Sequence, residues 1–267
     1  MIAVFSNWSA PLGNSGFLSR NDYILSLALS VKCARDIFPE VHFYGDKKSI
    51  DLIEGKIPFD KVFDSLEILN EKKIPPELSS YSRIFVYSLM DQPFAYINSD
   101  VYIREPLPQH ILDSNIFCQG WEHNTMSKGI ISLKNNGFYG NEYWERFYND
   151  KSITSIPNMQ IFGGNQFECI RQYASDIISM VEHPFNMEVL MHKRFLTEEI
   201  NKVLEQWYAV VRFIYFEGVE MDSLFNENGI CPIKYTHIID DAKKNRSIME
   251  KVKNKCKKEI KNLIIID

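Results

Sequence analysis

Two side chains with oxygen atoms, those of Asn98 and Asp100, follow the short apolar run 94–97 in the middle of the chain. Residues two apart in an extended segment face the same side, so the amide oxygen and the carboxylate can converge on one cation. Hard oxygen ligands favour Mg²⁺ or Mn²⁺ over zinc, and a cation held by few protein groups keeps positions open for substrate phosphates. The triplet Asn98-Ser99-Asp100 therefore predicts a metal site. The alternative is a tight turn between two strands, because all three are turn residues.

The elements before the triplet have to bring it to the edge of a sheet. The run 94–97 suits a buried parallel strand, which needs little alternation because its neighbours cover both faces. Apolar periodicity predicts further strands at 2–5, 41–44 and 61–63, and helices at 21–38, 49–54 and 76–90. This alternation is typical of doubly wound α/β folds, so we predict a nucleotide-binding half over residues 1–115.

The remainder of the chain gives a less regular pattern. It predicts strands at 116–120 and 129–133, and helices at 141–148, 163–181 and 197–216. No internal repeat or low-complexity linker separates these elements from the first half. We therefore predict one α/β domain over residues 1–267, with a central, mostly parallel, twisted sheet flanked by helices.

Composition limits the classes of partner and compartment. A chain of 267 residues with 45% hydrophobic residues can bury one large core. The net charge of −5 argues against a nucleic acid held on a broad cationic face, whereas small anionic substrates stay open. The five cysteines form no Cys-x-x-Cys pair and are expected to be reduced. No signal peptide or membrane span is recognisable, so we expect a cytoplasmic protein.

The triplet and its strand resemble the Asp-x-Asp region of GT-A fold glycosyltransferases, in which a hydrophobic strand delivers an acidic triplet to a metal and a nucleotide sugar. Asn98 stands where that family has the first Asp, which removes one negative charge. The resemblance implies a GT-A-like fold. It also implies that Asn98 and Asp100 bind Mn²⁺ or Mg²⁺, and that Asn98 contacts the donor.

The segment 235–243 resembles the closing His-x-x-Gly-x-x-Lys motif of metal-dependent members. His237 and Lys243 keep the spacing of six, while Asp240 stands where the family has Gly. The resemblance implies that His237 completes the metal shell and that Lys243 holds the diphosphate of the donor. Imidazole suits Mn²⁺, and a lysine point charge suits a leaving diphosphate. A lone His after a strand is more often structural, but the distant polar triplet favours a functional role.

Further donor contacts follow from the same resemblance. Arg83, fifteen residues before Asn98, lies where the family has an Arg that can hold donor hydroxyls or phosphate oxygens in a fork geometry. Phe5, Ser6 and Asn7, at the end of the first strand, would contact the nucleotide. A plain surface position is the alternative for Arg83.

Two further assignments concern catalysis and the acceptor. Glu205 is the candidate base or donor-sugar contact, because the family often has an acidic residue on a helix lining the site. Gly163, Gly164 and Asn165 resemble the family's acceptor-side glycine turn, where glycine permits close approach of a sugar ring. A solvated Glu and a simple helix start are the alternatives. In this interpretation residues 116–243 form the acceptor half.

The segment 244–267 is a predicted basic helix. Its apolar residues recur at helical spacing, at Ile248, Val252, Cys256, Ile260 and Leu263. A basic amphipathic helix can lie on anionic lipid, which gives possible peripheral contact with the inner face of a membrane. The alternative is a terminal helix docked on the domain with its lysines in water.

The predicted activity is transfer of a hexose from a nucleoside diphosphate sugar, a UDP sugar above all, to a saccharide or a lipid-linked glycan. This is what the resemblance to GT-A enzymes implies, and it makes the protein a metal-dependent hexosyltransferase. A nucleotidyltransferase and a non-catalytic protein that binds nucleotide sugars or glycans are the alternatives.

Overall fold

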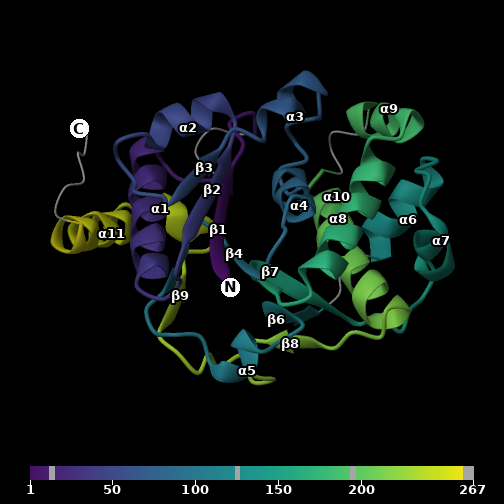
Figure 1. Ribbon diagram of the computed structural model, residues 1–267. Coiled ribbons are helices and arrows are strands. Elements are labelled where there is room, and N and C mark those ends of the chain that lie inside the picture. Colours follow the sequence, from purple (N-terminus) through teal and green to yellow (C-terminus); the bar gives the residue numbers. More distant parts are fainter. Residues whose placement is uncertain (12–15, 124–126, 193–196, 261–267) are drawn as a thin grey trace.

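The structure is a computed structural model that describes residues 1–11, 16–123, 127–192 and 197–260. Its main feature is a seven-stranded sheet in the order β3-β2-β1-β4-β7-β6-β8, shown in Figure 1. The strands are β1 (Ile2–Asn7), β2 (Val41–Gly45), β3 (Lys61–Phe63), β4 (Phe94–Ile97), β6 (Ile116–His123), β7 (Ser155–Gly164) and β8 (Met221–Ser223). Neighbours run parallel except at β7, which is antiparallel to both β4 and β6. The predicted α/β fold with a mostly parallel sheet is confirmed.

Helices cover both faces of this sheet. They are α1 (Arg20–Arg35), α2 (Lys47–Ile53), α3 (Glu67–Glu71), α4 (Tyr81–Ser88), α5 (Gln109–Leu112), α6 (Ser127–Asn135), α7 (Glu142–Phe147), α8 (Phe167–Val181), α9 (Pro184–His192), α10 (Thr197–Lys202) and α11 (Arg246–Glu259). One apolar core lies under α4 and α8, and a second lies under α1 and α11. In Figure 1 α11 is the outermost helix on the α1 side, so α1 is covered by the sheet and by α11. This explains why α1 is buried around most of its circumference.

The polar triplet forms a turn between β4 and a short second sheet. That sheet pairs β5 (Val101–Ile103) with β9 (Tyr235–His237), with Val101 opposite His237. Two buried serines of α1 hold the turn: Ser26 donates to the Ser99 carbonyl at 2.8 Å, and Ser30 donates to the Val101 carbonyl at 2.5 Å. These hydroxyls satisfy carbonyl groups that the turn leaves without a strand partner.

The predicted strand at 129–133 is wrong, because the segment belongs to α6. Ile130 and Leu133, three residues apart, are both buried, which is the spacing of one face of a helix. A run of apolar residues this short does not distinguish a strand from a buried helix. The predicted helix at 197–216 is also interrupted, since α10 is followed by π-helical segments at Val203–Trp207 and Val210–Phe216.

The predicted glycine turn at Gly163 and Gly164 is wrong as well. Both residues belong to β7, and the following helix α8 begins only at Phe167. A Cβ atom on Gly163 would lie 1.9 Å from the Phe94 carbonyl oxygen. Gly164 has φ +148°, and a Cβ atom there would lie 2.1 Å from the carbonyl oxygen of Asn115. These glycines therefore allow close packing of the backbone in the sheet.

The C-terminal helix α11 is docked on the domain. Met249, Val252 and Cys256 are buried against the α1 side of the core, and the Cys256 thiol donates to the Leu25 carbonyl at 3.1 Å. The docked-helix interpretation is confirmed for this part, and the apolar stripe is not free to enter lipid. Leu263 lies outside the described residues. Within the described ranges, no helix has the length and apolar character needed to cross a membrane.

We expect Met249→Ala to lower the free energy of unfolding by about 2 kcal/mol, because it removes a buried side chain from the contact between α11 and α1. Lys251→Ala, on the exposed face of the same helix, is the matched control and should leave stability unchanged. Urea denaturation followed by circular dichroism measures both. Equal stability of the two variants would contradict the contribution of Met249 to the core.

Candidate functional site

A cavity of about 630 Å³ opens between the carboxyl ends of β1 and β4. Small-molecule sites have volumes of about 300 to 1,000 Å³. The chain passes from β1 to β2 on one side and later returns to place β4 on the other side of β1. Open α/β sheets bind ligands in the crevice that such a reversal leaves at the carboxyl ends of the strands. The lining residues used below are Ser6, Asn7, Trp8, Arg83, Tyr96, Asn98, Asp100 and Lys243.

The end of β1 provides one wall of the cavity. Ser6 Oγ lies 2.9 Å from the Tyr96 hydroxyl on the neighbouring strand, and Asn7 Nδ2 donates to Ser49 Oγ at 2.8 Å. The indole N–H of Trp8 donates to the Asn70 side chain at 2.8 Å. The cavity thus has a wall of polar groups and an indole whose orientations are fixed.

Phe5 does not take part in this wall. Its side chain is fully buried in the core under α1, as strand alternation requires for a residue next to Ser6. The predicted contact between Phe5 and the nucleotide is therefore not supported. Trp8, which the sequence analysis did not single out, lines the cavity beyond the end of the strand.

Asp46 fixes the segment that carries Trp8. Its buried carboxylate follows β2 and accepts hydrogen bonds from the main-chain N–H groups of Ser9 and Ser49. Burial alone would raise the pKa of Asp46, but the hydrogen bonds from Ser49 and Ser9 outweigh this effect and lower it. A charge held in this way is a rigid anchor for the loop after β1.

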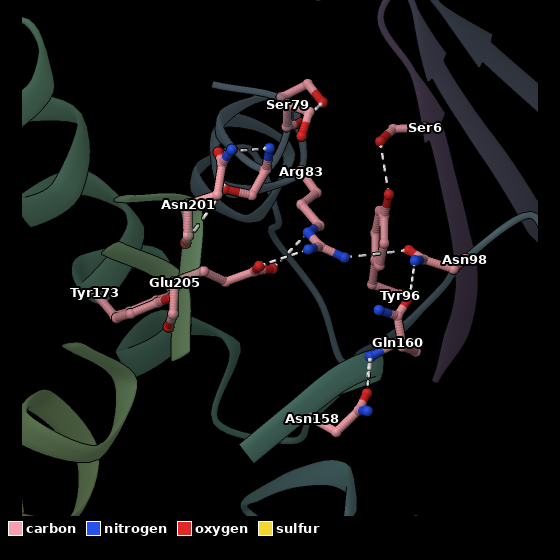
Figure 2. A network of polar contacts seen from close by, with 12 residues as sticks. Ser6, Ser79, Arg83, Tyr96, Asn98, Asn158, Gln160, Tyr173, Asn201 and Glu205 are labelled. Atoms are coloured by element: carbon pink, nitrogen blue, oxygen red, sulfur yellow. Dashed lines mark hydrogen bonds and ion pairs between the residues drawn. The ribbon is translucent and has the colours of Figure 1, made fainter. Parts of the chain in front are cut away.

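Arg83 and Glu205 form an ion pair between α4 and the π-helical segment after α10 (Figure 2). Arg83 Nε lies 2.5 Å from Glu205 Oε1, and an Nη2 proton is donated to Oε2 at 2.6 Å. Burial opposes the charge of the guanidinium, yet Glu205 raises the pKa of Arg83 above its usual value. The fork of Arg83 is therefore held in one orientation at the edge of the cavity.

Glu205 itself does not line the cavity. Burial raises its pKa to about 7, despite the guanidinium, and a value near neutrality suits a general base. However, the Glu205 side chain is only 2% exposed and both of its oxygens face Arg83. The geometry supports Glu205 as a positioning residue for Arg83 rather than as the predicted catalytic base.

Asn98 is held from two sides in the network of Figure 2. Its Oδ1 accepts a long hydrogen bond from Arg83 at 3.4 Å, and its Nδ2 donates to the side chain of Gln160. The Asn98 main-chain N–H also donates to the Gln160 carbonyl at 3.0 Å. Gln160 was not among the site residues predicted from the sequence. Its signal was a single polar residue between the apolar residues Met159 and Ile161 of a strand.

Asp100 lies on the other side of the turn, with both residues of the closing motif beside it. Lys243 Nζ is 2.6 Å from Asp100 Oδ2, and His237 Nε2 is 3.5 Å from the same oxygen. Although burial would raise the pKa of Asp100, contact with His237 and the charge of Lys243 hold it below its usual range. The expected convergence of Asp100, His237 and Lys243 is thus observed.

The predicted metal ligands do not fit a divalent cation in this arrangement. The Asn98 side chain is engaged by Arg83 and Gln160, and Asp100 Oδ2 is engaged by an ammonium group. Asp100 Oδ1 is buried and has no hydrogen-bond partner within the part of the chain that the structure describes. Among the described residues, no three His, Cys, Asp or Glu side chains gather in a group that could hold a metal. A Mg²⁺ or Mn²⁺ site that is open to substrate phosphates still uses one or two protein carboxylates, and here the one carboxylate of the triplet is engaged by the Lys243 ammonium.

The predicted acceptor residues lie away from the cavity. Gly164 pairs with Phe94 and Gly163 with Ala95, at the start of β4, whereas the cavity is at its end. Asn165 uses its side-chain amide on the main-chain carbonyls of Leu112 and Ser114. These contacts are structural, and none of Gly163, Gly164 and Asn165 lines the cavity.

We expect Glu205→Ala to lower the free energy of unfolding by about 3 kcal/mol, because it leaves the Arg83 guanidinium without its buried counter-ion. Replacing both partners, as Arg83→Met with Glu205→Ala, should restore part of this loss, since no unpaired charge is then buried. Chemical denaturation of the single and double variants gives the coupling free energy. Strictly additive losses would contradict the pairing.

Three solved structures show backbone similarity to the chain. The galactosyltransferase LgtC, solved with donor and acceptor sugar analogs, aligns with 100% of this chain and 98% of its own at 14% identity and a TM-score of 0.45. Mouse xyloside xylosyltransferase 1 aligns with 76% of this chain and 81% of its own at 11% identity and a TM-score of 0.39. The bifunctional glycosyltransferase WbbM aligns with 73% of this chain and 37% of its own at 13% identity and a TM-score of 0.39. The chain therefore spans little more than a third of that protein.

At the level of sequence, no match was found among curated proteins. One family matches almost the whole chain, over residues 3–263, and is described as a family of unknown function, DUF6734. The match includes all of the residues around the cavity and the main sheet from residue 3 onward. The chain belongs to the family of unknown function DUF6734.

Proposed function

We propose that the protein is a glycosyltransferase of the GT-A type that moves a hexose from a nucleoside diphosphate sugar, specifically a UDP sugar. The observation that carries this proposal is the cavity at the reversal between β1 and β4, with Arg83 and Lys243 among its lining residues. Two fixed cations in a crevice at the carboxyl ends of parallel strands suit a ligand that carries a diphosphate. The resemblance of the triplet and of the closing motif to GT-A enzymes agrees with this chemistry.

In this proposal the donor lies along the cavity with its base towards the end of β1. Ser6 and Asn7 have polar groups for the nucleoside, and the Trp8 indole can cover the face of the base. The diphosphate then faces Arg83 and Lys243. Arg83 can hold a phosphate or a sugar hydroxyl with the N–H groups that Glu205 does not use.

During transfer the bond between the sugar and the diphosphate breaks, and negative charge develops on the leaving group. Fixed positive groups aimed at that charge stabilise the transition state more than the ground state. Lys243, whose side chain is 20% exposed, can approach the diphosphate while keeping its contact with Asp100. The acceptor hydroxyl forms the new bond to the sugar as the bond to the diphosphate breaks. Its proton passes to an oxygen of the departing diphosphate, and the nucleoside diphosphate is released.

The acceptor and the compartment belong to the same proposal. A saccharide or lipid-linked glycan is the acceptor class that the motif resemblance implies. With the apolar stripe of α11 docked, a cytoplasmic protein would approach the inner face of a membrane only through exposed lysines such as Lys251, Lys257 and Lys258. Attraction of this kind is electrostatic and weakens as salt rises.

We expect UDP-glucose or UDP-galactose to raise the melting temperature of the protein. A ligand at 100 times its Kd stabilises the folded state by about 2.7 kcal/mol. Arg83→Met should abolish the shift, because it removes a cation from the cavity. Arg146→Met, which changes an exposed arginine on α7, is the control and should respond like the unchanged protein.

The same protein is then assayed for release of UDP from the stabilising sugar nucleotide. Slow hydrolysis without acceptor, lost in Arg83→Met, would support the transferase. Binding without any release, with or without added saccharides, would favour the non-catalytic binder. Stabilisation by a nucleoside triphosphate together with a sugar phosphate, and by no sugar nucleotide, would favour the nucleotidyltransferase. No shift with any nucleotide would contradict the proposal.

A further inference from the structure

We infer that the Lys243 ammonium takes the place of a divalent cation at the donor diphosphate, so that this site binds its donor without metal. The inference rests on the proposed function, because it concerns the diphosphate of a nucleotide sugar. It replaces the expectation of Mn²⁺ or Mg²⁺ at Asn98, Asp100 and His237.

The first support is the way in which Lys243 is held. Its Nζ lies 2.6 Å from Asp100 Oδ2 and 5.4 Å from the centre of the Phe17 ring. The loop residue Gly16 lies beside its stem, where an added Cβ would come within 3.7 Å of Lys243 Cδ. A carboxylate, an aromatic face and a loop therefore fix the ammonium at the mouth of the triplet turn.

The second support is the chain connection that brings Lys243 there. Val101 of β5 pairs with His237 of β9, and the Ile238 N–H donates to the Asp100 carbonyl at 3.0 Å. A short 3₁₀ helix, Asp240–Lys244, follows directly and carries Lys243. The main chain thus ties the lysine to the triplet independently of its side-chain contacts.

The third support is the charge at the site. Asp100 is the one acidic member of the triplet, and its Oδ2 atom is already paired with Lys243. A divalent ion at that oxygen would lie beside the ammonium and be repelled by it. It would also need the Asn98 oxygen, which now faces Arg83. Asn98 brings no charge to the triplet and Lys243 pairs with the remaining Asp, so the turn has no unbalanced negative charge that would attract a cation.

An ammonium group can perform the task assigned to the metal. Lysine has three N–H donors, and Asp100 takes one of them, so two are available for phosphate oxygens. Together with Arg83 it gives the diphosphate two cationic contacts from separate elements, α4 and the 3₁₀ helix after β9. Such fixed charges stabilise a leaving diphosphate without the exchange of a bound ion.

The test is isothermal titration of the full chain with UDP, in EDTA and again in Mn²⁺. We expect the two Kd values to agree within about twofold. Lys243→Met should weaken UDP binding about tenfold or more in both media, as loss of a charged partner at a phosphate does. Lys243→Arg, which keeps the charge, should retain most of the affinity. Lys244→Met, which changes the exposed neighbour, is the control and should bind like the unchanged protein.

Two results would overturn the inference while leaving the proposed function intact. One is UDP binding that becomes tenfold tighter or more when Mn²⁺ replaces EDTA. The other is binding of Mn²⁺ by the protein alone, seen as loss of the free-ion electron paramagnetic resonance signal and abolished by Asp100→Asn. Absence of UDP binding in both media would instead contradict the proposed function, and the inference with it. If Lys243→Met fails to fold, the comparison of UDP binding in EDTA and in Mn²⁺, made on the unchanged protein and on Lys243→Arg, still tests the inference.

Discussion

A carboxylate as deeply buried as that of Asp100 has to be neutralised, and this requirement links the middle of the chain to its end. Loss of solvation makes an unpaired charge in this position very costly. Lys243 provides the compensating charge and His237 lies beside the same oxygen, and both reach Asp100 because β9 pairs with β5. The position of α11 against α1 follows from the same connection, since α11 begins directly after the 3₁₀ helix that carries Lys243.

On the opposite side of the triplet, a second buried ion pair also links two distant parts of the chain. Arg83 and Glu205 are 122 positions apart in the sequence, and their contact fixes α4 against the helical segment after α10. Asn98 lies between the two pairs and contacts Arg83 directly. The cavity therefore has a cation on each side, each held by its own carboxylate. Buried pairs of this kind contribute little net stability, but they define geometry, which is what a diphosphate site requires.

Much of the fold could be predicted from the sequence, because the first half follows simple rules. Its predicted strands are short and largely apolar, and turn residues or Pro lie nearby. The predicted bounds, 2–5, 41–44, 61–63 and 94–97, lie within one or two residues of the observed strands. The segment 129–133 failed because five apolar-rich residues suit either a strand or a helix. Gly163 and Gly164 were assigned to a turn because glycine permits both turns and close strand packing, and a sequence cannot show which atoms approach.

Site residues that directly follow or belong to a strand could be predicted from the sequence. Contacts between side chains that are far apart in the sequence could not. Asp100, His237 and Lys243 converge as the motif spacing indicated, but the contact of Lys243 with Asp100 depends on register between β5 and β9. Nothing local to Glu205 reveals that Arg83 occupies both of its oxygens. Phe5 was included with its neighbours although strand alternation turns it into the core.

The most direct test of the account is a crystal structure of the protein with UDP bound. The account predicts UDP in the cavity between β1 and β4, with a diphosphate oxygen about 3 Å from Lys243 Nζ, a hydrogen-bonding distance, and the uracil against Trp8. UDP bound at another surface would contradict the assignment of the cavity. A metal ion between Asp100 and the phosphates, with Lys243 displaced, would contradict the role given to the lysine.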